Sequence, residues 1–237
     1  MPCNACGACL SVCPTGAIEM GDGKILYHPD QCVMCDACIH ACPRCSCPRL
    51  RWLTAEDTMT EIRKNLPFVR GVTVSGGECT QHRDYLKDLA DLCRKEGLSI
   101  LLDSNGSYDF SGDAELLQAV DGVMLDVKAW DEKEHLRLIG ATNQIVKKNL
   151  CYLAEHGKLA EVRTVAVPDE MNAAETVRMV SRTLSALGAG DVPYKIIRFR
   201  PMGVRPEYKH FRSPSPEELQ ALEAVARAEG MEKIIQI

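Results

Sequence analysis

The sequence predicts an α/β protein in which a parallel sheet with helices outside it follows a small cysteine-rich module. Two observations lead to this prediction. From Leu53 onward, short apolar runs alternate with helical patterns, the order typical of a parallel sheet, open or barrel-like. Before that point, ten of the thirteen cysteines lie within the first 47 residues. We therefore expect two domains, residues 1–50 and 51–237.

The cysteines of the first domain form an internal repeat with the spacing of metal ligands. Residues 3–14 and 32–43 both read C-x2-C-x2-C-x3-C-P, at a constant offset of 29 residues. Thiolate suits iron, and this spacing lets three cysteines wrap one cluster while the distant fourth reaches the other. Paired zinc knuckles would need only four cysteines each and no proline. The predicted ligands of two [4Fe-4S] clusters are Cys3, Cys6, Cys9 and Cys42, and Cys32, Cys35, Cys38 and Cys13.

The two halves of the repeat differ in what precedes them. A β-type run from Lys24 to His28 introduces the second half, whereas only Met1 and Pro2 come before Cys3. The repeat therefore looks cut at its beginning. We expect either that Met1 is an internal start in a longer reading frame or that the natural chain is truncated.

The second domain opens with a helix start signal. Thr54 and Asp57 have the Thr-x-x-Asp spacing of a helix N-terminus, so a helix is expected to about Asn65. The same periodicity argument predicts the remaining elements. The other helices should cover about 80–95, 114–119, 131–139, 145–156, 174–187 and 216–229. The strands should cover 71–74, 99–103, 122–126, 160–167 and 194–199.

Glycine, acidic and basic residues recur where the predicted strands end. In parallel barrels, the residues just past the carboxyl ends of the strands form the site. Glycine lets the backbone approach a ligand, acids hold an ammonium group or a cation, and basic side chains meet a carboxylate. Together they suit a zwitterionic amino-acid group, although each alone is typical of a turn or a helix cap. The candidates are Ser75, Gly76, Gly77, Glu78, Asp103, Ser104, Asn105, Gly106, Asp126, Val127, Lys128, Arg163 and residues 198–203.

As a set, these motifs resemble the radical S-adenosylmethionine (SAM) activating enzymes of glycyl radical enzymes, most closely those of the YjjW type. The resemblance covers essentially the whole chain, through the two-cluster repeat, SGGE, DSNG, GVMLDVKAWD, GKLAEVR and IIRFRPMGVR. It implies a partial (β/α)6 radical SAM barrel that is missing its first strand, with an N-terminal two-cluster bacterial-ferredoxin-like module.

The resemblance also implies roles for the strand-end residues. The family's GGE motif, which binds the SAM amino group, matches Gly76 to Glu78, and its arginine near the SAM carboxylate matches Arg163. Its DLK-like stretch matches Asp126 to Lys128. Relatives often place a SAM-contacting histidine near the end of the last strand, where this chain has Met202. A monovalent-cation site of relatives would fall on Asp103, Ser104, Met124 and Asp126.

Departures from the family concern mainly cysteines. The family's C-x3-C-x2-C, which holds the SAM-cleaving cluster at the end of the first barrel strand, does not precede the repeat. A literal C-x3-C-x2-C exists at Cys38, Cys42 and Cys45, but the repeat already uses the first two and no barrel strand precedes them. Cys45 and Cys47 are left as spare thiols or as ligands of a rearranged cluster. Cys79, after the GGE motif, is expected to be a packed thiol.

The implied reaction is reductive cleavage of SAM to methionine and a 5′-deoxyadenosyl radical, which abstracts hydrogen from a glycine of a partner glycyl radical enzyme. A flavodoxin or ferredoxin-type donor would supply electrons through the two clusters. A third, SAM-chelating [4Fe-4S] cluster is expected only in a longer form, so the chain as given is expected to be inactive. The alternative is a non-catalytic iron–sulfur electron-transfer or SAM-binding protein.

Composition argues against several other classes. The formal net charge is −5 without a Lys/Arg-rich block, so neither nucleic acid nor an anionic membrane is an expected partner. No apolar run approaches the roughly 20 residues that cross a bilayer, and no apolar signal segment follows the start. We expect a soluble, cytoplasmic protein.

Overall fold

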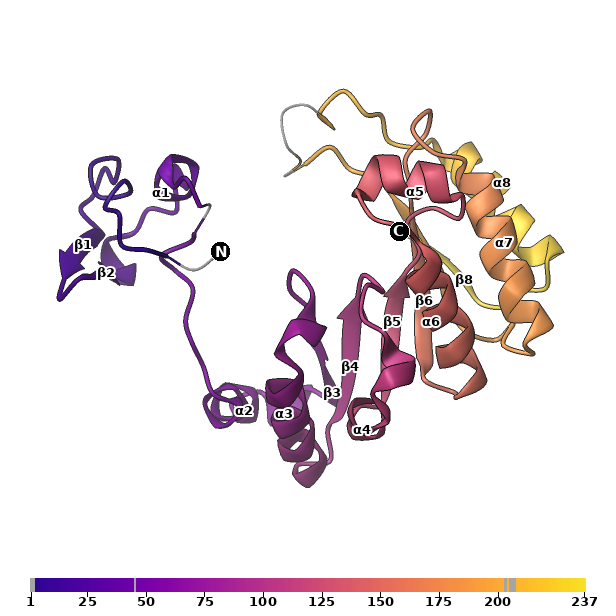
Figure 1. Ribbon diagram of the computed structural model, residues 1–237, viewed down its shortest axis with the longest axis horizontal. Coiled ribbons are helices and arrows are strands. Elements are labelled where there is room, and N and C mark those ends of the chain that lie inside the picture. The colour runs from indigo at the N-terminus through magenta and orange to yellow at the C-terminus, as the bar shows by residue number, and fades with distance from the viewer. Residues whose placement is uncertain (1–2, 45, 203, 205–207) are drawn as a thin grey trace. The chain divides into compact units, whose positions relative to one another are not determined.

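A computed structural model describes residues 3–44, 46–202, 204 and 208–237. The chain divides into two compact units, Met1–Leu53 and Thr54–Ile237 (Figure 1). Cys45 and Gly203, which figured in the sequence predictions, lie outside the described residues.

The first unit combines a hairpin with the cysteine-bearing loops. Strands β1 (Ile18–Gly21) and β2 (Lys24–Tyr27) pair antiparallel. Asp22 and Gly23 between them both have positive φ, 49° and 70°, as a tight two-residue hairpin turn requires. A short helix, α1 (Ala37–Ala41), follows the second set of cysteines. The run predicted before the second half of the repeat is therefore confirmed as β2, whereas β1 and α1 were not predicted.

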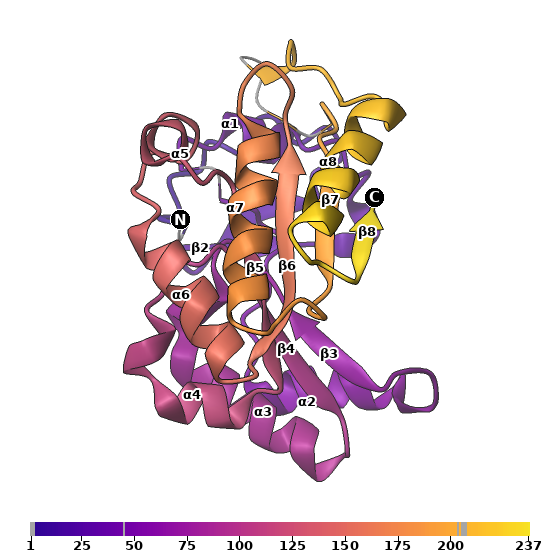
Figure 2. The same ribbon diagram turned by 90° about the vertical axis from the view of Figure 1, so that its right-hand side faces the viewer.

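The second unit is built on a parallel sheet. Within its described residues, six strands pair in the order β3-β4-β5-β6-β7-β8, which is also their order in the chain. Helices lie on one side of this sheet, with α6, α7 and α8 across its second half (Figure 2). The predicted α/β class with a parallel sheet is confirmed. The strands are β3 (Gly71–Val74), β4 (Ser99–Ser104), β5 (Gly122–Asp126), β6 (Leu159–Ala166), β7 (Tyr194–Arg198) and β8 (Ile234–Gln236).

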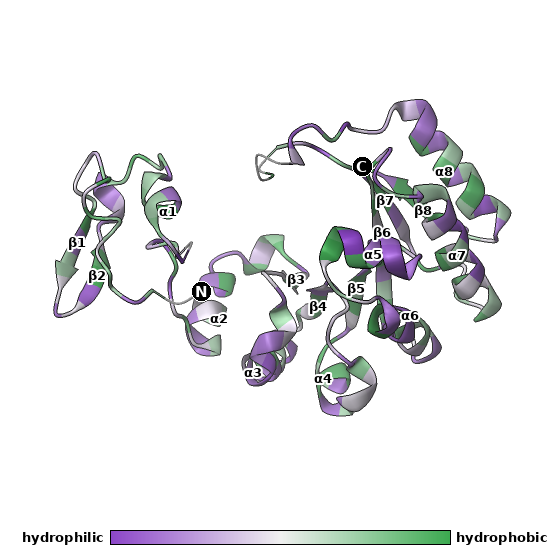
Figure 3. Cartoon of the chain, turned by 45° about the horizontal axis from the view of Figure 1, so that its top comes forward, coloured by the Kyte–Doolittle hydropathy of each residue, from purple (hydrophilic) through white to green (hydrophobic). Residues whose placement is uncertain are grey.

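The helices follow the predicted pattern closely. Thr54 caps the first of them, because its hydroxyl accepts from the Asp57 N–H at 3.1 Å and the Asp57 carboxylate accepts from the Thr54 N–H at 3.0 Å. The helices show hydrophobic and hydrophilic faces (Figure 3). They are α2 (Ala55–Arg63), α3 (Arg83–Lys95), α4 (Ala114–Ala119), α5 (Glu132–Ile139), α6 (Gln144–Glu155), α7 (Ala173–Ala186) and α8 (Pro216–Ala228).

Three sequence predictions for these elements were wrong in detail. The first helix ends at Arg63, after which a 3₁₀ turn spans Leu66–Phe68, since a proline inside that turn cannot continue a helix. The predicted helix from residue 80 begins instead with a 3₁₀ turn, Cys79–His82, and becomes α-helical at Arg83. Strand β8 was missed because three residues are too short for a periodic signal.

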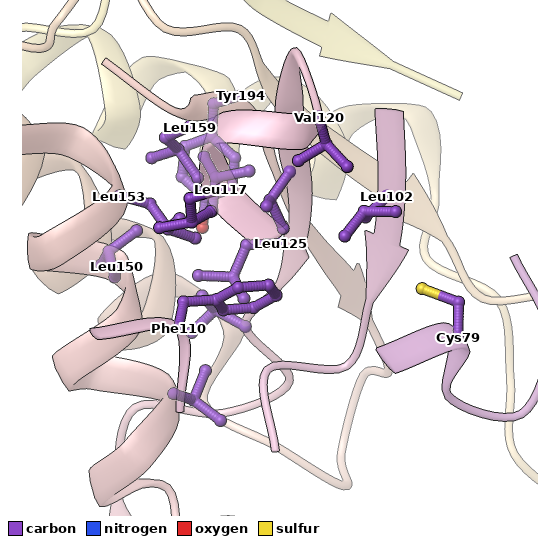
Figure 4. Packing of buried hydrophobic residues seen from close by; sticks show 14 of the residues in the cluster. Cys79, Leu102, Phe110, Leu117, Val120, Leu125, Leu150, Leu153, Leu159 and Tyr194 are labelled. Atoms are coloured by element: carbon purple, nitrogen blue, oxygen red, sulfur yellow. The ribbon is translucent and has the colours of Figure 1, made fainter. Parts of the chain in front are cut away.

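Side chains along the central strands alternate between two faces. Leu102, Leu125, Val162 and Ile196 are completely buried on the face that the helices cover. Phe110, Leu117, Leu150 and Leu153 fill the space beneath the helices (Figure 4). Burying each such side chain contributes about 1.5–3 kcal/mol, so this layer holds the unit together. The opposite face is free to carry polar side chains.

No helix among the described residues is both long enough and apolar enough to cross a membrane.

A buried carboxylate fixes the relative position of α3 and α4. Asp113 accepts from Arg83 Nη2 at 2.8 Å, from the Tyr108 hydroxyl at 2.6 Å and from the Leu116 N–H at 3.0 Å. The Arg83 guanidinium, the largest cause, holds the pKa of Asp113 well below its usual range. Its stabilisation is therefore present above the usual carboxyl pKa and is lost as pH falls through the depressed value.

We predict that Asp113→Asn lowers the free energy of unfolding by about 2–3 kcal/mol, because a charged hydrogen bond is lost at a buried position. The loss should shrink as pH falls through the acid range, since the wild-type carboxylate is then protonated too. Urea denaturation followed by circular dichroism between pH 3 and 7 measures this. Asp88→Asn, at an exposed position of α3, is the control. Equal effects of the two substitutions would contradict the assignment.

Candidate functional site

Four cysteines from both halves of the repeat line one cavity of the first unit. Cys3, Cys6 and Cys9 come from the first half, and Cys42 comes from the second half. The cavity has a volume of about 590 Å³, and Cys47 also lines it. The cysteines that the sequence assigned to one cluster are thus on one cavity wall, as the crossed pattern requires.

A second cavity is lined by the other four cysteines. Cys32, Cys35 and Cys38 come from the second half of the repeat, while Cys13 comes from the first. Helix α1 directs two neighbouring cysteines to different cavities. Cys38 lies within the helix and lines the second cavity, whereas Cys42 follows the helix with an extended backbone and lines the first. Each cavity is thus lined by four cysteines of the repeat, which is the donor set that a cubane cluster needs, and the first cavity has Cys47 in addition.

The repeat of the sequence is also a repeat of backbone geometry. Ala5 and Met34, which are 29 residues apart, both have φ of 55°. Their N–H groups donate to the sulfurs of Cys3 and Cys32 at 3.3 and 3.4 Å. Non-glycine residues rarely adopt positive φ, so the shared conformation indicates a shared demand, namely directing an N–H toward a thiolate.

Local donors favour the thiolate form of the distant fourth ligands. Backbone N–H groups lower the pKa of Cys13, with Thr15 the largest contributor, and that of Cys42, with Arg44 the largest contributor. At the second cavity, the neighbouring Tyr27 hydroxyl is the largest cause that lowers the pKa of the Cys32 thiol. A lower pKa increases the thiolate population that binds iron.

Cys45, part of the alternative C-x3-C-x2-C, lies outside the described residues. Within the residues that the structure describes, no three His, Cys, Asp or Glu side chains gather closely enough to hold a single metal ion. The cysteines face cavities of the first unit instead.

In the second unit, a buried glutamate joins the ends of the first two strands. Glu78, only 8% exposed, follows β3, and its Oε1 accepts from the Thr80 hydroxyl at 2.8 Å and the Ser104 hydroxyl at 3.0 Å. Its Oε2 accepts from the Asn105 N–H at 2.8 Å. All of these donors belong to the turn after β3 or to the end of β4. Glu78 therefore positions the backbone around it and has little capacity left for a ligand.

The two glycines before Glu78 present bare backbone. Gly76 has φ of 153°, and an added Cβ at Gly76 or Gly77 would meet no atom within 4 Å. The glycines are therefore not required by crowding within the chain. They leave the peptide groups at the end of β3 open to an incoming group such as an ammonium.

Charged side chains form a row across the face opposite the helices. Arg163 on β6 donates to Glu161 at 2.5 Å, to Asp103 on β4 at 2.9 Å and to the Met124 sulfur on β5 at 2.9 Å. Lys195 on β7 pairs with the second Glu161 oxygen at 2.8 Å. All are partly or largely buried, and each charge has an opposite partner, which limits the desolvation penalty.

The DLK-like stretch lies at the end of β5. Lys128 Nζ contacts Asp126 Oδ2 at 2.6 Å, and both side chains are partly exposed. Val127 is buried, and its N–H donates to the Arg163 carbonyl at 2.8 Å. The stretch thus places one ammonium group beside the charged row with part of its surface open.

Some predicted site residues are not brought together. Asp103 and Ser104 point to opposite faces of β4, and the Ser104 hydroxyl is bound to Glu78, so the proposed cation set does not share one face through its side chains. Met202, which relatives often replace with a SAM-contacting histidine, is 83% exposed. Ser75, at the end of β3, has no assigned partner among the described residues.

Sequence reasoning missed Thr80, Glu161 and Lys195. A signal existed for Glu161, which lies two residues before Arg163 and hence on the same face of its strand. Lys195 faces Arg163 only through the pairing register of β6 and β7, which the sequence does not reveal.

The cysteines of the second unit do not form a ligand set. Cys79 is buried and donates to the Asp103 carbonyl, and burial raises the pKa of its thiol to about 11. Cys93 is buried within α3 and Cys151 lies on α6. The expected packed thiol at Cys79 is confirmed. Among the described residues of this unit, no three ligating side chains gather at one point, so Cys79, Cys93 and Cys151 do not form the donor set of a SAM-chelating cluster.

Comparison with known families gives two matches. Residues 32–180 match the Radical SAM superfamily, and residues 2–45 match a 4Fe-4S dicluster domain. The first match implies SAM and a [4Fe-4S] cluster, and the second implies additional [4Fe-4S] clusters.

Three relatives of this chain carry the names of activating enzymes. A Haemophilus influenzae protein named as a glycyl-radical enzyme activating enzyme is 32% identical over 75% of each chain. The pyruvate formate-lyase 1-activating enzyme of Escherichia coli is 37% identical over 49% of this chain, and the match covers 50% of that relative. The trans-4-hydroxy-L-proline dehydratase activating enzyme of Clostridioides difficile is 26% identical over 95% of this chain and 80% of its own.

Solved structures share the fold. A domain of a pyruvate-formate lyase-activating enzyme from Bacteroides vulgatus superposes with a TM-score of 0.61 at 20% identity, covering 70% of this chain and 98% of that one. Streptococcus suis SuiB bound to S-adenosylmethionine superposes with a TM-score of 0.63 at 15% identity, covering 79% of this chain and 44% of its own. From its sequence matches, the chain belongs to the radical SAM superfamily and, within it, to the glycyl-radical-enzyme activating enzymes.

Proposed function

We propose that this chain is the SAM-binding and electron-relaying body of an activase that installs a glycyl radical on a partner enzyme. The observation that carries the proposal is the coexistence of two cavities, each lined by four cysteines of the repeat, with an open glycine turn and a charged row at the strand ends. When bound, a site-differentiated iron–sulfur cluster supplies the electron that cleaves SAM into methionine and a 5′-deoxyadenosyl radical.

The strand ends suit the amino-acid part of SAM. Peptide carbonyls around Gly76 and Gly77 would accept hydrogen bonds from its ammonium, because Glu78 keeps this turn open. Lys128 would meet its carboxylate, since part of the Lys128 side chain remains exposed beside Asp126. Arg163 already donates to three groups, so its role is to hold the row in place beside the ligand.

The first unit would carry electrons toward the second. Its two cavities would hold one [4Fe-4S] cluster each, one bound by Cys3, Cys6, Cys9 and Cys42 and the other by Cys32, Cys35, Cys38 and Cys13. A flavodoxin or ferredoxin-type protein is the proposed donor, and a glycyl radical enzyme is the proposed acceptor of the radical.

The SAM-cleaving step needs an iron with an open coordination position. Clusters with four cysteine ligands each have none, and Cys79, Cys93 and Cys151 are too dispersed to supply another set. We therefore propose that these 237 residues alone do not cleave SAM. The same observation favours the second candidate function, an electron-transfer or SAM-binding protein without catalysis.

Product formation distinguishes the two functions. The reconstituted chain, incubated with SAM and dithionite without oxygen, should give no 5′-deoxyadenosine above the protein-free control. A chain extended by a strand bearing C-x3-C-x2-C ahead of residue 1 should form it, as liquid chromatography would measure. The matched control is the extended chain with those three cysteines changed to serine. If the unextended chain matches the extended one, another set, such as Cys38, Cys42 and Cys45, must supply the site. If the extended chain is also inactive, the non-catalytic function is favoured.

Crossed ligation has a separate test. The unmodified chain should bind about eight irons, four in each cluster. Cys42→Ser should expose Cys3, Cys6 and Cys9 to alkylation while the other four ligands stay protected, because it removes the fourth ligand of their cluster. Peptide mass spectrometry after iodoacetamide treatment measures this.

Cys13→Ser is the reciprocal variant and should expose the second set, Cys32, Cys35 and Cys38. Alkylation of the sequence neighbours of the substituted cysteine, with the other half protected, would show uncrossed clusters.

A further inference from the structure

Arg49 connects the tail of the first unit to the loop of the second cavity. Its Nη2 lies 2.5 Å from Asp36 Oδ1, and its Nη1 lies 3.6 Å from the Met34 sulfur. Its Nε lies 3.5 Å from the sulfur of Cys47, which lines the first cavity. Only the second cavity counts Arg49 among its described lining residues, and the guanidinium side chain is 27% exposed there.

The loop that Arg49 contacts has an unusual backbone. Asp36 adopts φ of 60°, whereas the equivalent position of the first half is Gly7, with φ of 79°. A non-glycine residue is strained in this left-handed conformation. The ion pair with Arg49 offsets part of that strain and holds the loop between Cys35 and Cys38. The two halves therefore reach the same shape by different means.

Tyr27 adds a second donor to the same cavity. It ends strand β2 and lines the cavity together with Cys32, so its hydroxyl is a donor available to the Cys32 sulfur. Among the described lining residues of the first cavity, Lys24 is the charged side chain, and it is exposed to solvent without a contact to a cysteine sulfur. Water therefore screens Lys24 more than Arg49.

We propose that Tyr27 and Arg49 selectively raise the reduction potential of the cluster held by Cys13, Cys32, Cys35 and Cys38. Reduction adds negative charge to a cluster, so a hydrogen bond to a ligand sulfur and a nearby cation stabilise the reduced form more than the oxidised form. Asp36 offsets part of the Arg49 charge, whereas the neutral Tyr27 donor acts without such an offset. The inference rests on the proposed ligand sets.

The proposal gives the two residues a role in the relay. Because the two clusters have identical ligand spacing, a difference between their reduction potentials must come from the residues around them. Which of the two clusters holds a single electron depends on the difference between their reduction potentials. Tyr27 and Arg49 would set that difference without touching SAM or the strand ends of the second unit.

Potentiometric titration followed by electron paramagnetic resonance tests the proposal on the reconstituted full chain. A Cys35→Ser variant identifies which signal belongs to the second cluster. Tyr27→Phe and Arg49→Gln should each make the midpoint potential of that cluster more negative and leave the other cluster unchanged. Arg51→Gln, which removes the same charge from an exposed side chain that lines neither cavity, should shift neither potential.

An unchanged potential of the second cluster in both variants, or an equal shift of both clusters, would overturn the inference. The ligand sets are tested separately, since about eight irons in the unmodified chain would uphold them. Fewer irons in the unmodified chain would instead contradict the ligand sets. If Arg49→Gln loses the second cluster, Tyr27→Phe decides alone, since it removes one hydroxyl and keeps the ring.

Discussion

The strand-end site depends on the carboxylate of Glu78. Strand β3 pairs with β4 along Gly71 to Val74 and, within the described residues, has no partner on its other side. Beyond Val74 the turn is held by Glu78, which binds Thr80 in its own turn and Ser104 and Asn105 at the end of β4, and by the buried Cys79, whose thiol donates to the Asp103 carbonyl. A buried carboxylate with several hydrogen bonds is strongly positioned, because losing any donor leaves a desolvated charge.

The two faces of the sheet divide the work of stability and binding. Apolar side chains such as Leu125 and Ile196 bury the helix-covered face, so the fold does not depend on the opposite face. That face can therefore hold Arg163 and its partners, although desolvating charges opposes folding. Because each charge in the row is paired, the desolvation penalty stays small, and the side chains are held in place before a ligand binds. Preorganisation of this kind favours binding of a zwitterion.

Much of this architecture could be predicted from the sequence, for identifiable reasons. Period and caps are local signals, so β5 and α4 were predicted with their observed bounds, and the cysteine spacing indicated which thiols line each cavity. Contacts set by register are not local. The sequence therefore did not reveal that Lys195 meets Glu161, that the Ser104 hydroxyl donates to Glu78, or that Arg49 reaches Asp36. Strand β8 was too short to carry a pattern.

Hydrogen exchange of the full chain with and without SAM tests most directly whether the strand ends bind this ligand. Mass spectrometry at saturating SAM should show slower exchange in peptides covering residues 75–78 and 126–128, with no change in α8. Glu78→Gln should weaken the protection at 75–78, because its amide cannot accept all of the hydrogen bonds that hold the turn. Protection absent from both strand ends, or confined to the first unit, would contradict this account of the site.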